Sequence, residues 1–387
     1  MISEPGGRRD RLVNPVPRTY VHGFRTLPFG QVQNIHPRTH VRGVLWYGVN
    51  QMRLYRTIIA ILAMISVQGS LCKELEGSTL EKINVSYGSI SGTQSPVWVA
   101  KEKALFEKQG LDTNLVYISG GPRSVMAMLG GSVQFVIHSA MPSLEAYIGG
   151  ADTVLIGTSM NHLDHYLVVH PSIANSQDLR GKIVGISALG SLTDVALREA
   201  LRLNGLSERE ITVLAVGDLS ARMSALRTGT IHGTLLIGAQ AAAAAKMGFR
   251  LLIDFSKLPI EVSTSSILSR RAYVLKNPDT TLKFLKAWVE GTYFFKAKRE
   301  VSRDIMRKYT RTEDPEVLDS IYDRYRNLIL SKPLPSMAVV KSMLRILSRT
   351  RPVVRDINPE GFVELRFMRE LERSGFFEEM SRQYPTE

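Results

Sequence analysis

Two short loops rich in hydroxyl groups each lie between an expected strand and an expected helix. Residues 89–94 hold two serines, a threonine and a glutamine, and residues 187–194 hold two serines, a threonine and an aspartate. Hydroxyl groups and the free N–H groups of a helix start bind small polar or anionic groups. The local alternative is that Ser95, Thr193 or Asp194 caps its helix, and capping is compatible with ligand contact. The first candidate binding residues are therefore Ser89, Ser91, Thr93, Gln94, Ser187, Gly190, Ser191, Thr193 and Asp194.

Three further loops also follow expected strands, and they would complete the walls of such a site. They are residues 138–142, 217–218 and 237–240, and their candidate residues are Ser139, Met141, Gly217, Asp218 and Gly238. Arg123 and Arg222 lie one helical turn beyond these loops, where we expect them to point away from the site. That expectation weakens the case for a strongly charged ligand, although N–H groups and hydroxyls alone suffice to hold a sulfonate.

The segment His162–His165 combines two imidazoles with the carboxylate of Asp164, which are groups that bind metals. The spacing is loose, however, and a third ligand is not evident in the sequence. We therefore predict no metal site and no cofactor. One or both histidines are expected instead to serve as hydrogen-bond partners at the hinge of a cleft, and His162 is included among the candidate ligand-binding residues.

An internal duplication supplies the elements that would position these loops. Residues 116–139 read as strand, Gly-Gly turn, amphipathic helix and strand, and residues 214–238 repeat that order. A strand and a helix precede each copy, beginning at Lys82 and Lys182. The first of these helices is expected to run from Pro96 to Gly110 with Ala104 in its buried stripe. Two similar α/β lobes in series therefore leave a cleft that strand ends and helix starts face.

The same pattern sets the expected domain boundaries. We expect lobe one to comprise residues 82–168 and 264–387, and lobe two to comprise residues 169–263, with crossover segments at 166–169 and 262–268. The C-terminal part reads as helices, beginning with residues 278–297 and 301–309, followed by four more helical segments. Their apolar periodicity predicts that these helices pack on lobe one.

Composition narrows the possible functions. The 387 residues are 44% hydrophobic and carry a net charge of +13. This basic balance gives modest support for an anionic ligand, while a solvated basic surface remains the alternative. A nucleic-acid-binding motif is not found, so nucleic acid is not an expected partner. The single cysteine, Cys72, excludes an internal disulfide and a cysteine-rich metal site.

The first 72 residues do not have the pattern of a folded domain. Residues 1–51 lack periodicity, and we expect them to be disordered or to come from a wrongly assigned upstream start, with translation beginning at Met52. Residues 52–72 have the basic, apolar and small-residue order of a secretory signal peptide. Cleavage after Gly69 would release a soluble periplasmic protein, and lipid attachment at Cys72 is the less favoured alternative.

Four segments match a known family: residues 99–111, 119–121, 178–187 and 225–229. On these segments, the part from Lys82 to Phe377 resembles periplasmic substrate-binding proteins of ABC transporters for nitrate, taurine and aliphatic sulfonates, the NMT1/THI5-like group. The resemblance implies the type II two-lobed periplasmic-binding-protein fold, with ligand contacts from the loops named above. It also implies a monomer that captures a small anionic or polar organic molecule and delivers it to an inner-membrane permease and its ATPase.

The chain departs from this family at two positions and leaves other functions open. Many relatives have an aspartate where this chain has Gln134 and His232, positions inside strands where we expect an effect on packing. An enzyme on the same scaffold, either a thiamin-pyrimidine synthase or a desulfinase, would need cysteines that this chain lacks within the fold. A periplasmic sensor is a third reading. We predict a non-enzymatic receptor, whose ligand could be a sulfonate, a nitrate-like anion, a pyrimidine or an aromatic carboxylate.

Overall fold

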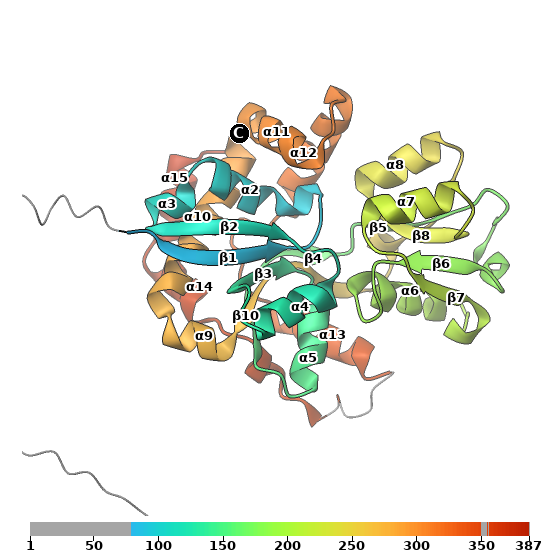
Figure 1. Cartoon of the computed structure of the whole chain (residues 1–387), viewed down its shortest axis with the longest axis horizontal. Helices are drawn as coiled ribbons and strands as arrows, with labels where there is room; N and C mark the ends of the chain where they lie inside the picture. Colours follow the sequence, from blue (N-terminus) through green and yellow to red (C-terminus); the bar gives the residue numbers. More distant parts are fainter. Residues whose placement is uncertain (1–78, 350–353, 355, 387) are drawn as a thin grey trace, which may run out of the picture. The chain divides into compact units, whose positions relative to one another are not determined.

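The computed structural model describes residues 79–349, 354 and 356–386, which lie in one compact unit, Gly77–Glu387. The expected extension at 1–51 and the signal peptide at 52–72 lie outside the described residues. Two five-stranded sheets organise the described part, each with helices on its faces (Figure 1). This confirms the predicted α/β class with two similar lobes, which we call lobe one and lobe two.

The sheet of lobe one has the strand order β2-β1-β3-β10-β4. Its strands are β1 (Glu81–Tyr87), β2 (Leu111–Tyr117), β3 (Phe135–His138), β4 (Thr153–His162) and β10 (Glu261–Arg270). β1 pairs in parallel with β2 and β3, while β10 runs antiparallel between β3 and β4. The register places Tyr87 beside Tyr117 at the carboxyl ends of two neighbouring strands.

The sheet of lobe two has the order β7-β6-β8-β5-β9, which repeats the arrangement of the first sheet. Its strands are β5 (His165–Val169), β6 (Ile183–Ile186), β7 (Thr212–Ala215), β8 (Gly233–Ile237) and β9 (Arg250–Asp254). β6 pairs in parallel with β7 and β8, as β1 does with β2 and β3, and β5 runs antiparallel to β8. The duplication seen in the sequence is therefore a duplication of sheet topology.

The helices between these strands begin where the strands end. Those of lobe one are α2 (Ser95–Glu102), α3 (Leu105–Lys108), α4 (Gly121–Leu129) and α5 (Met141–Ile148), and η1 (Gly92–Gln94) precedes α2. Those of lobe two are α6 (Leu192–Leu203), α7 (Leu219–Arg227) and α8 (Gly238–Lys246). The single helix predicted from Pro96 to Gly110 is wrong, because Ala104 adopts a left-handed conformation (φ 53°) and separates α2 from α3. Ala104 is exposed, not buried.

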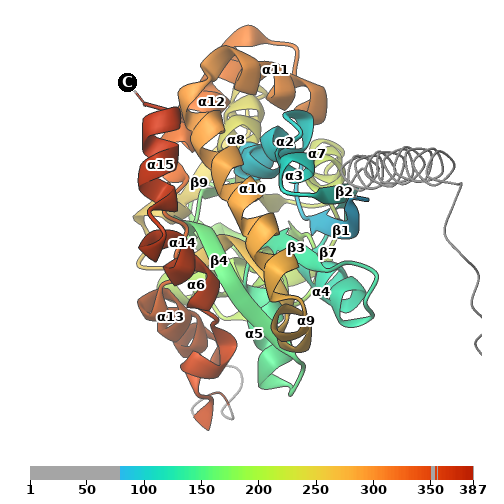
Figure 2. The same cartoon turned by 90° about the vertical axis from the view of Figure 1, so that its left-hand side faces the viewer.

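The C-terminal helices complete lobe one. They are α9 (Arg271–Lys276), α10 (Pro278–Ala297), α11 (Arg299–Thr310), α12 (Pro315–Leu328), α13 (Met337–Leu347), α14 (Arg366–Arg373) and α15 (Phe376–Gln383). α10 lies between α2 and α3 on one side and α14 and α15 on the other (Figure 2). Its residue Phe284 stacks on Phe135 of β3, with ring centroids 4.1 Å apart, and on Phe106 of α3 at 5.6 Å. The apolar periodicity of α10 thus forms core.

The chain passes between the two sheets at two places. The first is Leu163–Asp164, between β4 and β5, and the second is residues 258–260, between the short helix η4 (Phe255–Lys257) and β10. Both crossings lie a few residues before the expected boundaries at 168/169 and 263/264. No helix in the described segments is both long enough and apolar enough to cross a membrane.

Candidate functional site

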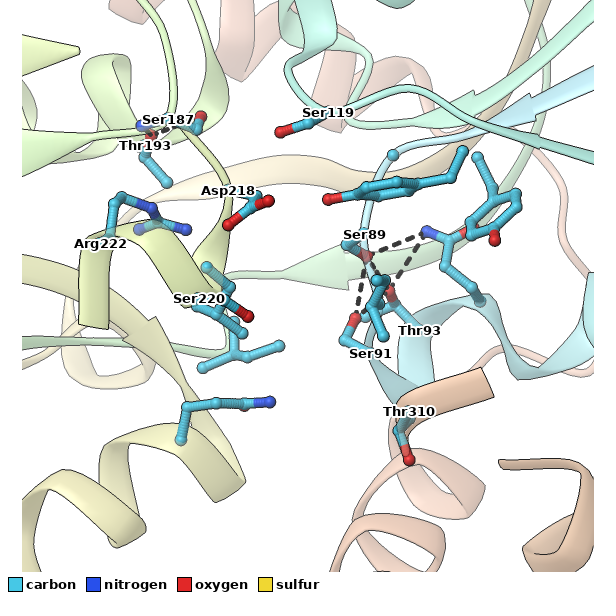
Figure 3. Close-up of a pocket in the computed structure, with 18 of the residues that line it drawn as sticks. Ser89, Ser91, Thr93, Ser119, Ser187, Thr193, Asp218, Ser220, Arg222 and Thr310 are labelled. Atoms are coloured by element: carbon cyan, nitrogen blue, oxygen red, sulfur yellow. Dashed lines mark hydrogen bonds between the residues drawn. The ribbon is translucent and has the colours of Figure 1, made fainter. Parts of the chain in front are cut away.

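A cavity of about 980 Å³ is lined by residues of both lobes and by the end of α11. Its walls are the loops after β1, β2 and β3 on one side, and the starts of α6 and α7 with the end of β8 on the other (Figure 3). Strand ends and helix starts therefore converge on one space. Of the candidate residues, those that line it are Ser89, Ser91, Thr93, Gln94, Ser139, Ser187, Thr193 and Asp218.

On lobe one, three hydroxyl groups form a closed cluster after β1. Ser89 Oγ lies 2.9 Å from Ser91 Oγ, which lies 2.8 Å from Thr93 Oγ1. The amide of Gln94 donates to Ser89 Oγ at 3.4 Å, while its Oε1 is buried and has no hydrogen-bond partner among the described residues. A Cβ at Gly92 would lie 2.1 Å from the ring of Tyr325, so only glycine lets the loop pack against α12 there.

On lobe two, a matching hydroxyl cluster surrounds the start of α6. Ser187 Oγ lies 2.9 Å from both Ser191 Oγ and Thr193 Oγ1, and the Ser187 N–H donates to Thr193 Oγ1 at 2.9 Å. Ser191 also caps the helix, because its side chain accepts from the N–H of Asp194 at 3.4 Å. Ser187 and Thr193 line the cavity, whereas Ser191 is buried behind them.

The structure places seven candidate residues outside the cavity lining: Met141, His162, Gly190, Ser191, Asp194, Gly217 and Gly238. Met141 belongs to the apolar core, and His162 is exposed at the end of β4. Gly190 and Asp194 line a separate cavity of about 370 Å³, where the Asp194 carboxylate accepts from the Gly190 N–H at 2.8 Å and from Arg198 at 2.7 Å. A Cβ added to Gly238 would lie 3.2 Å from the side chain of Arg324, so this helix start packs against α12.

Arg222 lines the cavity, contrary to the expectation that it points away. It is 6% exposed, and its Nη1 donates to the carbonyl of Leu235 on β8 and, at 3.4 Å, to the hydroxyl of Thr234. In Figure 3 its guanidinium lies among Thr193, Asp218 and Ser220. Burial lowers the pKa of Arg222 to about 10, and the nearby Asp218 carboxylate opposes this shift. The group is therefore a buried cation at neutral pH.

Two histidines in the lining are held neutral by burial. Burial lowers the pKa of His138 to about 4, and its Nδ1 accepts from the Ser139 N–H at 2.8 Å. Burial lowers the pKa of His165 to about 3, and the charge of Arg222 contributes to that shift. Across the described part of the chain, no group of three His, Cys, Asp or Glu side chains is arranged to hold a metal ion.

An aromatic wall on lobe one was missed by the sequence analysis. The rings of Tyr87 and Tyr117 line the cavity with centroids 5.6 Å apart. Trp98 packs edge-on behind Tyr87 at 6.0 Å and stacks on Tyr309 of α11 at 4.7 Å. Tyrosine as the last residue of two neighbouring parallel strands was the signal that could have identified this wall.

A buried carboxylate connects the first crossing between the lobes to α12. Asp164 is 3% exposed and accepts from the hydroxyl of Tyr325 at 2.9 Å and from the guanidinium of Arg324. Asp164 and Tyr325 both line the cavity. Residues from α11 and α12 thus reach the site, although more than 200 residues separate them from Ser89 in the sequence.

Comparisons with known proteins agree with this architecture. A model of the family described as NMT1/THI5 like matches residues 93–300, more than half of the chain. YtlA of Bacillus subtilis (strain 168), which is named a binding protein, is 24% identical over 276 residues, covering 68% of this chain and 80% of YtlA.

Three solved structures show similar folds. A protein from Bordetella bronchiseptica RB50 has a TM-score of 0.68 at 18% identity, covering 79% of this chain and 98% of that protein. The alkanesulfonate-binding protein SsuA of Xanthomonas axonopodis, bound to MOPS, has a TM-score of 0.61 at 20% identity, covering 73% and 98%. The desulfurization enzyme DszB has a TM-score of 0.56 at 12% identity, covering 76% and 99%. The chain therefore belongs to the NMT1/THI5-like family and has the fold of periplasmic binding proteins.

Proposed function

We propose that this protein is an extracytoplasmic receptor that captures a small anionic or polar organic molecule and delivers it to an ABC importer. The observation that carries the proposal is the cavity between the lobes, to which each lobe contributes a hydroxyl cluster at its strand ends. Because the described chain passes between the sheets at two places, a ligand held by both clusters would favour the closed arrangement of the lobes. The names of YtlA and SsuA support a binding role.

The charges around the cavity favour an anion. The ionisable Arg, Lys, Asp and Glu side chains that line it are Arg222, Arg227, Lys308, Arg311, Asp164 and Asp218. Both carboxylates are engaged within the protein, Asp164 with Arg324 and Tyr325, and Asp218 as the cap of α7, where it accepts from the Ala221 N–H at 2.8 Å. Lys308 is paired with Glu102 at 2.7 Å, so Arg222, Arg227 and Arg311 are the cations that set the field in the cavity and attract negatively charged solutes.

An enzyme on this fold has less support. The desulfurization enzyme shares the fold, but no cysteine lines the cavity of this chain, whose single cysteine is Cys72. A thiolate nucleophile is therefore absent from the cavity lining. A sensor that passes ligand binding to a signalling partner remains the second candidate, and genes for a permease and an ATPase beside this gene would favour uptake over sensing.

The proposal includes export, which the predicted signal peptide supports, and transporter partners, which the family resemblance supports. The receptor acts in the periplasm as a soluble monomer, with lipid attachment at Cys72 as the alternative, and its partners are an inner-membrane permease and ATPase. Mass spectrometry of the N-terminal peptide of the native protein tests this directly. A mature N-terminus after Gly69 supports the soluble form, an acylated Cys72 supports the lipoprotein, and a peptide from residues 1–51 contradicts the start at Met52.

Thermal unfolding of the processed protein against a panel of small sulfonates, carboxylates, pyrimidines and inorganic anions tests the binding role. A solute present at 100 times its Kd adds about 2.7 kcal/mol to the unfolding free energy. At roughly 2–4 °C per kcal/mol, the melting temperature rises by several degrees. A saturable shift supports the receptor. A cooperative melt that no panel member raises would count against it.

A further inference from the structure

The two lobes offer the ligand different chemistry. We propose that the solute is a small planar aromatic molecule carrying one anionic group, with the anion on Arg222 of lobe two and the ring against Tyr87 and Tyr117 of lobe one. This inference rests on the proposed receptor function, and it names the substrate class of the same cavity.

Arg222 is built to receive an anion. Its Nη1 is anchored on the carbonyl of Leu235, which fixes the guanidinium against β8, and its Nε has no hydrogen-bond partner among the described residues. It forms no ion pair with any carboxylate in the described part of the chain, and Asp218 is occupied with capping α7. A buried charge without a contacting counter-charge costs free energy. A carboxylate or sulfonate in the cavity would supply that counter-charge and bind two guanidinium N–H groups at once.

The opposite wall is a rigid aromatic surface. Tyr87 and Tyr117 lie side by side across the β1–β2 pair at an interplanar angle of 43°, Trp98 packs behind Tyr87, and Tyr309, which also lines the cavity, stacks on Trp98. Burial raises the pKa of both tyrosines, so that their phenols are neutral at physiological pH and do not repel an anion. A planar aromatic solute would stack on these rings and gain ring–ring contact that a saturated ring cannot make.

The size of the cavity and the rest of its lining fit an aromatic anion better than an inorganic ion or a neutral heterocycle. A cavity of about 980 Å³ is at the upper end of what organic ligands occupy, and an inorganic ion would leave most of it filled with water. Apolar side chains also belong to the lining, one from β4 and four from the lobe-two wall: Met160, Leu192, Leu219, Met223 and Ile237. A neutral heterocycle would use the rings but leave Arg222 without a counter-charge.

Matched sets of three compounds test the proposal. Each set holds an aromatic monoanion, its saturated-ring anion and its neutral amide, for example benzoate, cyclohexanecarboxylate and benzamide, with larger and sulfonate-bearing sets alongside. Affinity is measured by titration calorimetry on the processed protein. We expect the aromatic anion of at least one set to bind at least tenfold more tightly than both of its partners.

Three variants and one control variant assign the preference to residues. Arg222→Gln should reduce the affinity for the aromatic anion at least tenfold and bring it close to that of the amide. Tyr117→Leu should remove the preference for the aromatic over the saturated ring, while Tyr117→Phe, which keeps the ring, should retain it. Arg209→Gln removes an exposed charge of lobe two outside the cavity and should leave every affinity unchanged.

The outcomes separate this inference from the receptor function. Tight binding of a saturated, neutral or inorganic member with no preference for aromatic anions overturns the inference and leaves the receptor standing. Wild-type affinity in a folded Arg222→Gln variant overturns it as well. The absence of binding to every compound in all sets and in the anion panel contradicts the receptor function, and the inference falls with it.

Discussion

Desolvation sets the charge states of three ionisable residues in the cavity lining. Arg222 remains charged because its pKa, lowered to about 10, is still well above neutrality. His138 and His165 are neutral for the same physical reason, since burial penalises the charged form of each ring. The site therefore presents one fixed inner cation beside two uncharged imidazoles, and its charge pattern should not change between pH 6 and pH 8.

The two half-buried histidines of the cavity lining make the stability of the fold depend on acid. An unfolded histidine titrates near 6.5, whereas the folded pKa is about 4 for His138 and about 3 for His165. The folded state thus binds fewer protons, so its stability is complete above pH 6.5 and is lost as the pH falls towards these values. Each histidine contributes a slope of up to about 1.4 kcal/mol per pH unit.

Urea unfolding at pH 7.5 and pH 5.0 measures this effect. Removing one of these rings, in His138→Asn or His165→Gln, should reduce the acid-induced loss of unfolding free energy by about 2 kcal/mol relative to the wild type. The exposed His170→Gln serves as the control and should keep the wild-type loss. Equal acid dependence in the wild type and both cavity-lining variants would show that these rings are not held neutral.

At the scale of elements, α10 and α2 approach so closely that one glycine decides their packing. A Cβ on Gly291 would lie 2.4 Å from the backbone carbonyl of Pro96. In an exposed helix, alanine would gain about 1 kcal/mol over glycine. We expect Gly291→Ala instead to destabilise the protein by at least about 2 kcal/mol, because backbone cannot yield as a flexible side chain does.

Chemical denaturation of Gly291→Ala tests this, with Gly149→Ala as its control. Gly149 follows α5 with an ordinary backbone conformation (φ −77°), and its nearest obstacle is the Ala146 carbonyl at 3.3 Å. The control should change the unfolding free energy by less than about 1 kcal/mol. A Gly291→Ala protein as stable as the wild type would mean that α10 and α2 are not in backbone contact.

The carboxylate between β4 and β5 ties the first crossing to α12. Asp164→Ala should cost about 3 kcal/mol of unfolding free energy, because it leaves the Tyr325 hydroxyl and the Arg324 guanidinium without their shared acceptor. The comparison is Arg307→Gln, which removes the exposed pair with Asp304 on α11 and should cost less than about 1 kcal/mol. Similar losses of unfolding free energy in the two variants would show that the buried Asp164 contact contributes no more than an exposed ion pair.

The features that were predictable from the sequence arise from local signals, and the features that were missed depend on the three-dimensional structure. The alternating strands, the glycine stops and the proline that begins α10 are local signals, so the two sheets and the Pro278–Ala297 helix were predictable. The break at Ala104 has no local signal, because alanine rarely adopts the left-handed conformation and its type does not announce one. The inward turn of Arg222 depends on the carbonyl of Leu235, which a periodicity cannot reveal.

At the scale of the whole described unit, exposed cations at the cavity should speed the arrival of an anionic solute. Arg227, Lys308 and Arg311 are exposed residues of the lining, contributed by α7 and the end of α11. Their field acts over about one Debye length, roughly 10 Å at 0.1 M salt. We expect the double variant Arg227→Gln, Arg311→Gln to lower the association rate severalfold at low salt and to leave the dissociation rate unchanged.

Stopped-flow fluorescence measures both rates, since Trp98 packs directly behind the cavity wall. Raising the salt to 1 M should bring the wild-type association rate down to that of the variant. An association rate independent of salt would indicate that these charges do not steer the ligand.

The path of the chain through the two lobes has a consequence for the order in which they fold. Lobe two is one continuous segment, from β5 to η4, and all its strand partners lie within it. Lobe one is made of two segments that are separated in the sequence. β3 and β4 pair with β10, and Phe135 packs against α10, and both β10 and α10 follow lobe two in the chain. When the chain emerges N-terminus first, lobe one begins to emerge before lobe two. Lobe two nevertheless has all its strands first, because lobe one is completed only by β10 and α10. We expect lobe two to acquire protease resistance first, and the apolar strands of lobe one to be the segments that stay exposed longest.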